Sequence, residues 1–137
     1  MIGLDTNVIV RYLIQDEPSQ TKGANSIFER AVAERQTLGI SQVVLCEVVW
    51  VLEDCYEQNK KVIVNIIKQL LLTEQIRIEH DSVVRQALYD FENQSGVDFS
   101  DCLIGRQNAF NGFSFTYTFD KIAAKRLHTT FKLIQSS

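Results

Sequence analysis

The sequence has few residues of the kinds that break or cross-link a chain. Its 137 residues include one proline, six glycines and three cysteines, and no segment rich in Gly, Ser or Pro separates one part from another. We therefore expect a single domain over residues 1–137, long enough to bury a hydrophobic core. Three widely spaced cysteines favour free thiols in a reducing compartment over a disulfide framework or a zinc site.

Long apolar runs and an excess of basic charge are lacking too. The longest apolar stretch is too short to cross a membrane, and no basic segment of a signal peptide follows Met1, so we expect a cytoplasmic protein with no membrane partner. The net charge of −3 and the pI near 5.4 argue against binding of nucleic acid by bulk electrostatics. They still allow a nuclease if bound cations mask several acids.

What the sequence does contain is an alternation of short β-like runs and amphipathic helical stretches. This alternation predicts an α/β fold in which a central, mainly parallel sheet of four to five strands is flanked by helices. The predicted strands are 2–4 (buried), 38–41, 76–78, 113–117 and 131–134. The predicted helices are 6–14 (capped by Thr6), 18–35 (with Pro18 in its first turn), 42–52 (capped by Ser41), 60–72, 82–96 (capped by Asp81 or Ser82), 100–111 and 121–127.

Two aspartates follow predicted strands. Asp5 comes directly after the first strand, and Asp120 comes a few residues after the strand 113–117. Because active sites in parallel sheets lie at the carboxyl ends of the strands, both side chains are expected at one crevice. Each aspartate could equally be an ordinary helix cap.

Glu47 lies within a run of apolar residues, from Val43 to Leu52. A helix that is apolar on nearly every side is expected to be buried, and a buried carboxylate needs a partner such as a cation. The alternative is a single exposed position on a half-buried helix.

Asp98 and Asp101 stand three residues apart at the start of a predicted helix. This spacing can place both carboxylates on one face, at the helix end that favours anions. Asp101 precedes Leu103 and Ile104 inside the helix, which favours a ligand role, whereas Asp98 is either a ligand or a cap.

Several carboxylates in one crevice repel one another unless a divalent cation neutralises them, and a ligand set of oxygens alone suits Mg²⁺ or Mn²⁺. Zinc is not favoured, because the two histidines, His80 and His128, lie near no acid in a ligand-like spacing. The sequence also lacks a recognisable Ser or Cys nucleophile arrangement and a phosphate-binding glycine loop. Metal-assisted hydrolysis is the chemistry that remains.

These residues, in this order, resemble PIN-domain ribonucleases and in particular the VapC-type toxins of toxin–antitoxin pairs. The matching segments are Ile2-Gly3-Leu4-Asp5-Thr6-Asn7-Val8, Glu47 in its apolar helix, Phe99-Ser100-Asp101-Cys102-Leu103-Ile104 and Thr118-Phe119-Asp120. The resemblance implies a three-layer PIN-like fold and an acidic catalytic and metal site of Asp5, Glu47, Asp101 and Asp120, with Asp98 as an auxiliary acid. Asn7 and Thr118 match polar positions that orient carboxylates.

The resemblance further implies an RNA substrate, a cognate antitoxin protein and a homodimer. Arg11, Arg106 and Lys121 are candidates for RNA contacts, although each could be a solvated surface charge. Two other functions are open. The first is a phosphatase that forms an aspartyl-phosphate on Asp5, but Asn7 stands where that class has a second aspartate. The second is a PIN domain of weak or no catalytic activity that binds RNA or protein.

Overall fold

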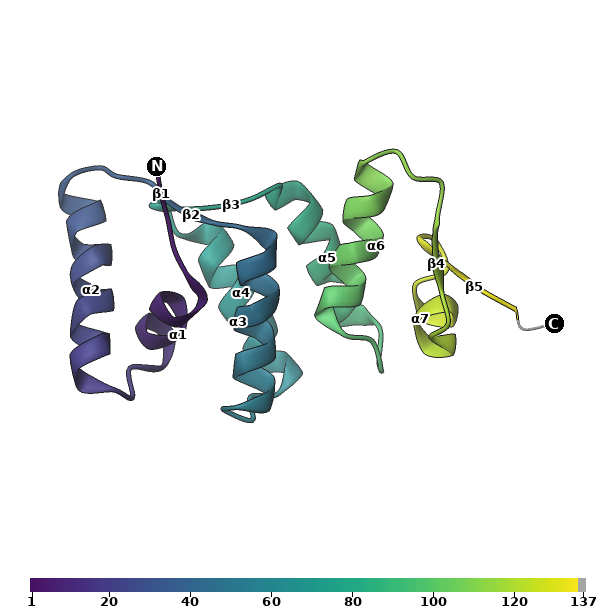
Figure 1. Cartoon of the computed structure of the whole chain (residues 1–137), viewed down its shortest axis with the longest axis horizontal. Coiled ribbons are helices and arrows are strands. Elements are labelled where there is room, and N and C mark those ends of the chain that lie inside the picture. The colour runs from purple at the N-terminus through teal and green to yellow at the C-terminus, as the bar shows by residue number, and fades with distance from the viewer. Residues whose placement is uncertain (136–137) are drawn as a thin grey trace. The chain divides into compact units, whose positions relative to one another are not determined.

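The computed structural model describes residues 1–135 (Figure 1), and the chain within them forms seven helices and five strands. The strands are β1 (Ile2–Gly3), β2 (Leu38–Ile40), β3 (Ile76–Ile78), β4 (Thr116–Thr118) and β5 (Phe131–Leu133). The helices are α1 (Thr6–Ile14), α2 (Pro18–Ala33), α3 (Gln42–Asp54), α4 (Lys60–Leu72), α5 (Asp81–Asn93), α6 (Phe99–Phe110) and α7 (Lys121–Arg126). Contacts divide the chain into two compact units, with unit 1 from Met1 to Glu79 and unit 2 from His80 onward.

Unit 1 is built on a parallel sheet in the order β1-β2-β3. Leu38 pairs with Ile2 on one side and with Ile76 on the other. Parallel neighbours need crossover connections, and here α1 and α2 link β1 to β2 while α3 and α4 link β2 to β3. The predicted βαβ pattern is therefore confirmed in this unit.

The first strand differs from its prediction. Ile2 and Gly3 are exposed, and burial begins at Leu4. Within unit 1, β1 stands at one end of the strand order and pairs with β2 alone. Apolar character alone did not distinguish an edge strand from a central one.

The core of unit 1 comes from the apolar stripes of its helices. Ile9 of α1, Leu45 and Leu52 of α3, and Ile63 and Ile67 of α4 are almost wholly buried. Their helical spacing is the amphipathic pattern that predicted these helices. Tyr12 of α1 also stacks on Phe28 of α2, with ring centroids 3.7 Å apart, which fixes the α1–α2 pair.

Unit 2 contains a pair of packed helices, α5 and α6, and a short parallel pair, β4 and β5, joined by α7. Phe91 of α5 meets Phe99 of α6 edge to face at 5.8 Å. Arg106 of α6 donates two hydrogen bonds to the carboxylate of Asp90 in α5, at 2.6 and 2.8 Å. This half-buried, two-pronged ion pair orients the two helices as well as holding them together.

The strand predicted at 113–117 begins later, at Thr116, and includes Thr118. Phe113 and Phe115 lie before the strand and are exposed, so their alternation with Ser114 and Thr116 does not mark a β-strand. The start of β4 is set by pairing instead, because Thr116 lies opposite Phe131 of β5. The five strands predicted for one sheet are paired as three and two, each set within its own unit.

Three helix starts also differ from prediction. Asp5, not Thr6, caps α1. His80, in the left-handed conformation at φ 47°, precedes α5, where Asp81 or Ser82 was expected as the cap. Helix α6 begins at Phe99 with Asp98 at its cap position. Each shift is one or two residues, as expected where neighbouring polar residues compete for one cap.

Parallel strands separated by helices confirm the predicted α/β class. None of the helices within residues 1–135 combines the length and the apolar character that a membrane span requires.

Substitution of alanine for two helical glycines should change the stability of the protein in opposite directions. A Cβ on Gly105 in α6 would lie 2.6 Å from the Thr130 hydroxyl oxygen and 2.8 Å from a ring carbon of Phe131, whereas one on Gly23 in α2 would meet no atom within 4 Å. We expect Gly105→Ala to destabilise the protein by about 1–3 kcal/mol through overpacking. Gly23→Ala should stabilise it by about 0.5–1 kcal/mol, because alanine favours the helix. Urea unfolding of both variants measures the change in the free energy of unfolding. Equal changes of the same sign would contradict the packing argument.

Candidate functional site

Asp5 and Glu47, the two candidate acids of unit 1, are linked by Thr6. The backbone N–H of Thr6 donates to Oδ1 of Asp5 at 2.8 Å, and its hydroxyl donates to Oε2 of Glu47 at 2.8 Å. Thr6 itself is buried, whereas both carboxylates are exposed, so each bond joins a fixed donor to an accessible acid. One residue therefore positions two carboxylates that are 42 residues apart in the sequence.

Sequence reasoning assigned Thr6 to the helix start and missed this contact. No local pattern marks a threonine whose hydroxyl reaches a glutamate in another helix. The signal that could have found it is the pairing of a buried hydroxyl directly after Asp5 with a carboxylate inside an apolar helix, since buried polar groups require partners.

The burial expected for Glu47 is wrong. Glu47 is exposed in the structure, as are Val43 and Trp50 on the same face of α3. The opposite face, with Leu45 and Val48 among its residues, forms the core contact. Apolar residues are common on protein surfaces, so the density of apolar residues around Glu47 overestimated its burial.

Unit 2 holds the other three candidate acids near one another. Asp98 lies at the cap position of α6, Asp101 in the first turn of α6, and Asp120 at the cap of α7. Burial raises the pKa of Asp101, and the negative charges of Asp98 and Asp120 raise it further. Asp101 is thus half-buried within reach of the negative charges of two other carboxylates, which a bound cation would offset.

Asp5 and Asp120 act as helix caps, as their alternative interpretation expected, and the capping uses one oxygen each. Oδ1 of Asp120 accepts from the backbone N–H groups of Ile122 and Ala123, and Oδ1 of Asp5 accepts from that of Thr6. No hydrogen bond to either Oδ2 is seen within residues 1–135. A cap fixes the carboxylate and still leaves an oxygen for a ligand role.

The two polar residues carried over from the resemblance have different surroundings. The hydroxyl of Thr118 accepts the backbone N–H of Asp120 at 3.0 Å, which shapes the turn that carries this acid. Asn7 is exposed and lines a groove between α1 and α2. Among the residues that the structure describes, Thr6 rather than Asn7 bonds Glu47.

Across residues 1–135, no group of three or more His, Cys, Asp or Glu side chains is close enough to hold one metal ion. Unit 1 contributes two candidate acids and unit 2 contributes three. Their chemistry fits a hard divalent cation, because every candidate ligand is a carboxylate oxygen and the acids around Asp101 already repel one another. The thiols beside Glu47 and Asp101 do not suggest zinc, since Cys102 is buried and burial raises the pKa of Cys46.

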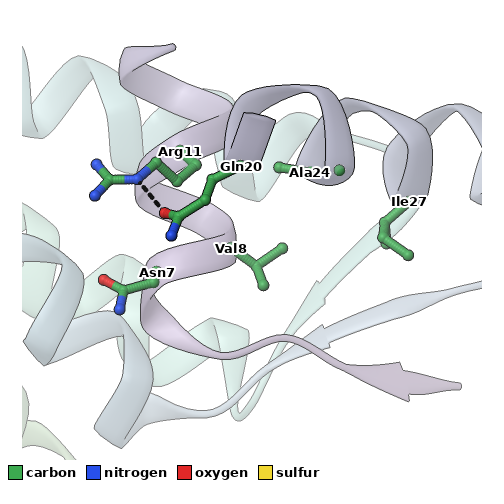
Figure 2. Close-up of a pocket in the computed structure, with 7 residues that line it drawn as sticks. Asn7, Val8, Arg11, Gln20, Ala24 and Ile27 are labelled. Carbon is green, nitrogen blue, oxygen red and sulfur yellow. Dashed lines mark hydrogen bonds between the residues drawn. The ribbon is translucent and has the colours of Figure 1, made fainter. Parts of the chain in front are cut away.

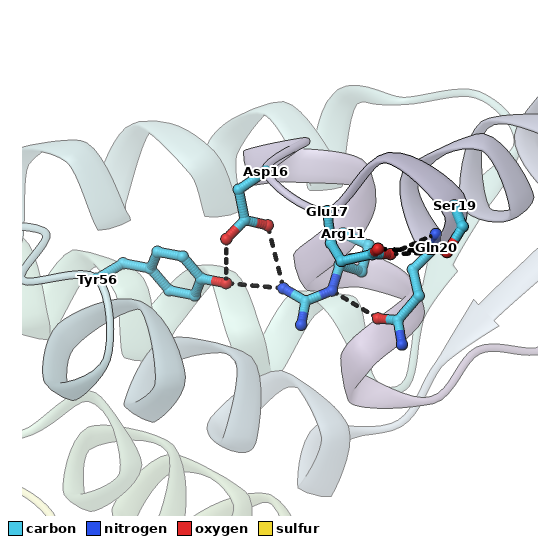
Figure 3. Close-up of polar contacts among 6 residues, drawn as sticks. All are labelled: Arg11, Asp16, Glu17, Ser19, Gln20 and Tyr56. Carbon is cyan, nitrogen blue, oxygen red and sulfur yellow. Dashed lines mark hydrogen bonds and ion pairs between the residues drawn. The ribbon is translucent and has the colours of Figure 1, made fainter.

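The structure gives two of the three candidate basic residues internal partners. Arg106 is held by Asp90, as described above. Arg11 donates to Gln20 at 2.7 Å, to Asp16 at 3.1 Å and to the hydroxyl of Tyr56 at 2.7 Å (Figure 3). Lys121 is exposed directly after Asp120, and no ion pair of this lysine is seen in the described part of the chain.

The raised pKa of Asp101 makes stability depend on pH. A carboxyl whose pKa is higher in the folded state destabilises the fold once it is ionised, and this cost disappears below its ordinary value of 3.8, where both states are protonated. We therefore expect Asp101→Asn to raise the melting temperature at pH 7 in the presence of chelator. The gain should shrink as the pH falls towards 3.8. Asp54→Asn, at the exposed end of α3, is the control. A gain for Asp101→Asn that is equal at pH 7 and at pH 3.8 contradicts the assignment.

Comparison with known proteins identifies the family. The family model of the PIN domain matches residues 2–127, a range that includes all five candidate acids. The chain is also similar to a VapC ribonuclease of Aquifex aeolicus (strain VF5), with 26% identity over 100 residues that cover 73% of each chain. The match to the family model extends over both units, so the chain belongs to the PIN-domain family.

Proposed function

We propose that this PIN-domain protein is a metal-dependent endoribonuclease that hydrolyses RNA phosphodiester bonds, with Asp5, Glu47, Asp101 and Asp120 as its acidic residues. The observation that carries the proposal is the family match over residues 2–127, which includes all four. The similarity to a VapC ribonuclease supports RNA as the substrate. We further propose that the chain acts as one domain.

The acids would hold Mg²⁺ or Mn²⁺, with Asp98 as an auxiliary ligand. When bound, the ion supplies positive charge to the reacting phosphate and to the leaving oxygen. The chain's own residues prepare that charge balance. Thr6 holds Asp5 and Glu47 in place, Thr118 shapes the turn at Asp120, and the crowding around Asp101 favours an added cation over three bare carboxylates.

We also propose that the ribonuclease is the toxin of a toxin–antitoxin pair, inhibited by a cognate antitoxin protein, active as a homodimer and located in the cytoplasm. The support is the resemblance to VapC-type toxins and the VapC ribonuclease among similar proteins. Of the basic candidates, Lys121 is the most available for RNA, since Arg11 and Arg106 are engaged within their units.

The first test is cleavage of a mixed RNA substrate with Mg²⁺, with Mn²⁺ or with excess chelator. Cleavage should require the metal, and Asp5→Ala and Asp101→Ala should abolish it because each removes a ligand. Thr6→Val keeps the shape but removes the hydroxyl that holds Glu47, so it should lower the rate by about 10–100-fold, and Thr6→Ser should restore most of it.

Asp54→Asn is the matched control, because Asp54 lies on α3 two turns beyond Glu47 and belongs to no candidate set. It should cleave at the parent rate. Full cleavage in chelator, or by both alanine variants, would refute the site. Metal-independent RNA binding with no cleavage by the parent would show a binding module instead.

The toxin assignment has a separate test. Induced expression of the chain in a bacterial host should arrest growth, and Asp5→Ala at matched expression should not, because arrest depends on hydrolysis. Colony counts after induction measure this. Arrest by both proteins would point to a cause other than RNA cleavage, and unaffected growth with an enzyme that is active in vitro would exclude the toxin role in that host.

A further inference from the structure

An open groove of about 430 Å³ lies between α1 and α2 in unit 1 (Figure 2). Its wall is apolar along most of its length, where Val8, Ala24 and Ile27 face it. Asn7, Arg11 and Gln20 supply polar groups, with Arg11 and Gln20 at the end opposite Ile27 in the view of Figure 2. A flat molecule with a polar edge matches this combination better than an ion does.

Gly23 keeps the groove open. It lies in the middle of α2, where glycine weakens a helix, and a Cβ at this position would touch nothing within 4 Å. The packing of the protein itself therefore does not require a glycine here. The absent side chain leaves space in the groove for something other than the chain.

The polar end of the groove is held rigidly. Asp16 and the hydroxyl of Tyr56 bind the guanidinium of Arg11, and its Nε donates to Oε1 of Gln20 at 2.7 Å (Figure 3). Tyr56 in turn donates to Asp16 at 2.9 Å. This chain of bonds fixes the side-chain amide of Gln20, so that its oxygen faces Arg11 and its NH₂ group remains to donate to a ligand.

The charges beside the groove disfavour an anion. Asp16 offsets Arg11 at 3.1 Å, and Glu17, which accepts the backbone N–H of Gln20 at 2.6 Å, adds a second negative charge nearby. A phosphate would meet these carboxylates. A nucleobase is neutral, has a flat apolar face and carries hydrogen-bonding edges that Asn and Gln side chains recognise in other complexes.

We propose that this groove, defined by Asn7, Val8, Arg11, Gln20, Ala24 and Ile27, binds an unstacked base of single-stranded RNA. This inference rests on the proposed ribonuclease function and names a substrate subsite for it. Asn7 follows Asp5 by two residues at the start of α1, so a base in the groove belongs to a nucleotide near the phosphate that Asp5 serves. The groove then helps to select which bond is cut.

The test fills the groove and leaves the acids untouched. Gly23→Leu places a side chain in the open space and should keep or raise the melting temperature. Ser26→Leu puts the same side chain on another part of the α2 surface and is the matched control. Gln20→Met removes the amide while keeping similar bulk. Each substitution is made in the Asp101→Asn background, so that binding is measured without cleavage, and also in the active protein.

The probes are fluorescently labelled single-stranded RNAs that contain only adenosine, only cytidine or only uridine. Their binding is measured by fluorescence anisotropy. Gly23→Leu should weaken binding of the preferred RNA by about tenfold or more and reduce the preference among the three, and Gln20→Met should act in the same direction. Ser26→Leu should bind as the parent does. In the active protein, Gly23→Leu should raise KM with little change in kcat. Adenosine, which presents a base without a phosphate, should shift the side-chain amide resonance of Gln20.

Parent-like affinity and preference in Gly23→Leu, with RNA binding and cleavage intact, would overturn the subsite and leave the ribonuclease proposal standing. Unchanged RNA binding together with lost binding of a partner protein would likewise overturn it and assign the groove to that protein. A parent that neither binds nor cleaves RNA refutes the ribonuclease, and the subsite falls with it.

Discussion

The hydroxyl of Thr6 is the contact on which the arrangement of the two candidate acids of unit 1 depends. It donates to Glu47 of α3, while the backbone of the same residue donates to Asp5 at the start of α1. The position is stable because Thr6 is buried and because α1 packs against α3 beneath it. Removing that hydroxyl frees the exposed carboxylate of Glu47 from the direction in which Thr6 holds it, so the main loss is of position. The groove begins at the next residue, Asn7, so the acids and the groove share one helix start.

Helix capping and metal binding are compatible uses of an aspartate. A cap needs one oxygen in a fixed direction, and Asp5 and Asp120 each use Oδ1 for it. Because the cap already fixes the side chain, less conformational entropy would be lost when Oδ2 binds an ion. The caps that the structure shows for these aspartates are therefore compatible with the ligand role proposed for them.

Prediction from sequence succeeded where the signal was periodic and failed where it depended on distant partners. The apolar spacing of α4 predicted Lys60–Leu72 with both ends in place, and β3 was predicted residue for residue. Both elements bury one face, and this burial produces a regular spacing of apolar residues that can be recognised in the local sequence. Glu47 was expected to be buried, but an apolar run does not show which face meets the core. The start of β4 depends on Phe131 of β5, which no local pattern near Thr116 reveals. The positions of the candidate acids at strand ends, at helix starts and in an apolar helix suggested a site, and their role in it stays a prediction.

Net charge constrains how such a chain can hold RNA. With a formal charge of −3 the chain has no net surplus of basic residues for phosphates, and two of the three candidate contacts, Arg11 and Arg106, are engaged by Asp16 and Asp90. A divalent ion bound to the acids would make the local electrostatic potential less negative, but it would attract any phosphate and would not distinguish one nucleotide from another. Discrimination among nucleotides has to come from groups that contact bases. A part-apolar groove with a fixed amide donor serves that purpose, and because it contacts a base rather than a phosphate, we expect the contact to be less sensitive to salt than phosphate binding would be.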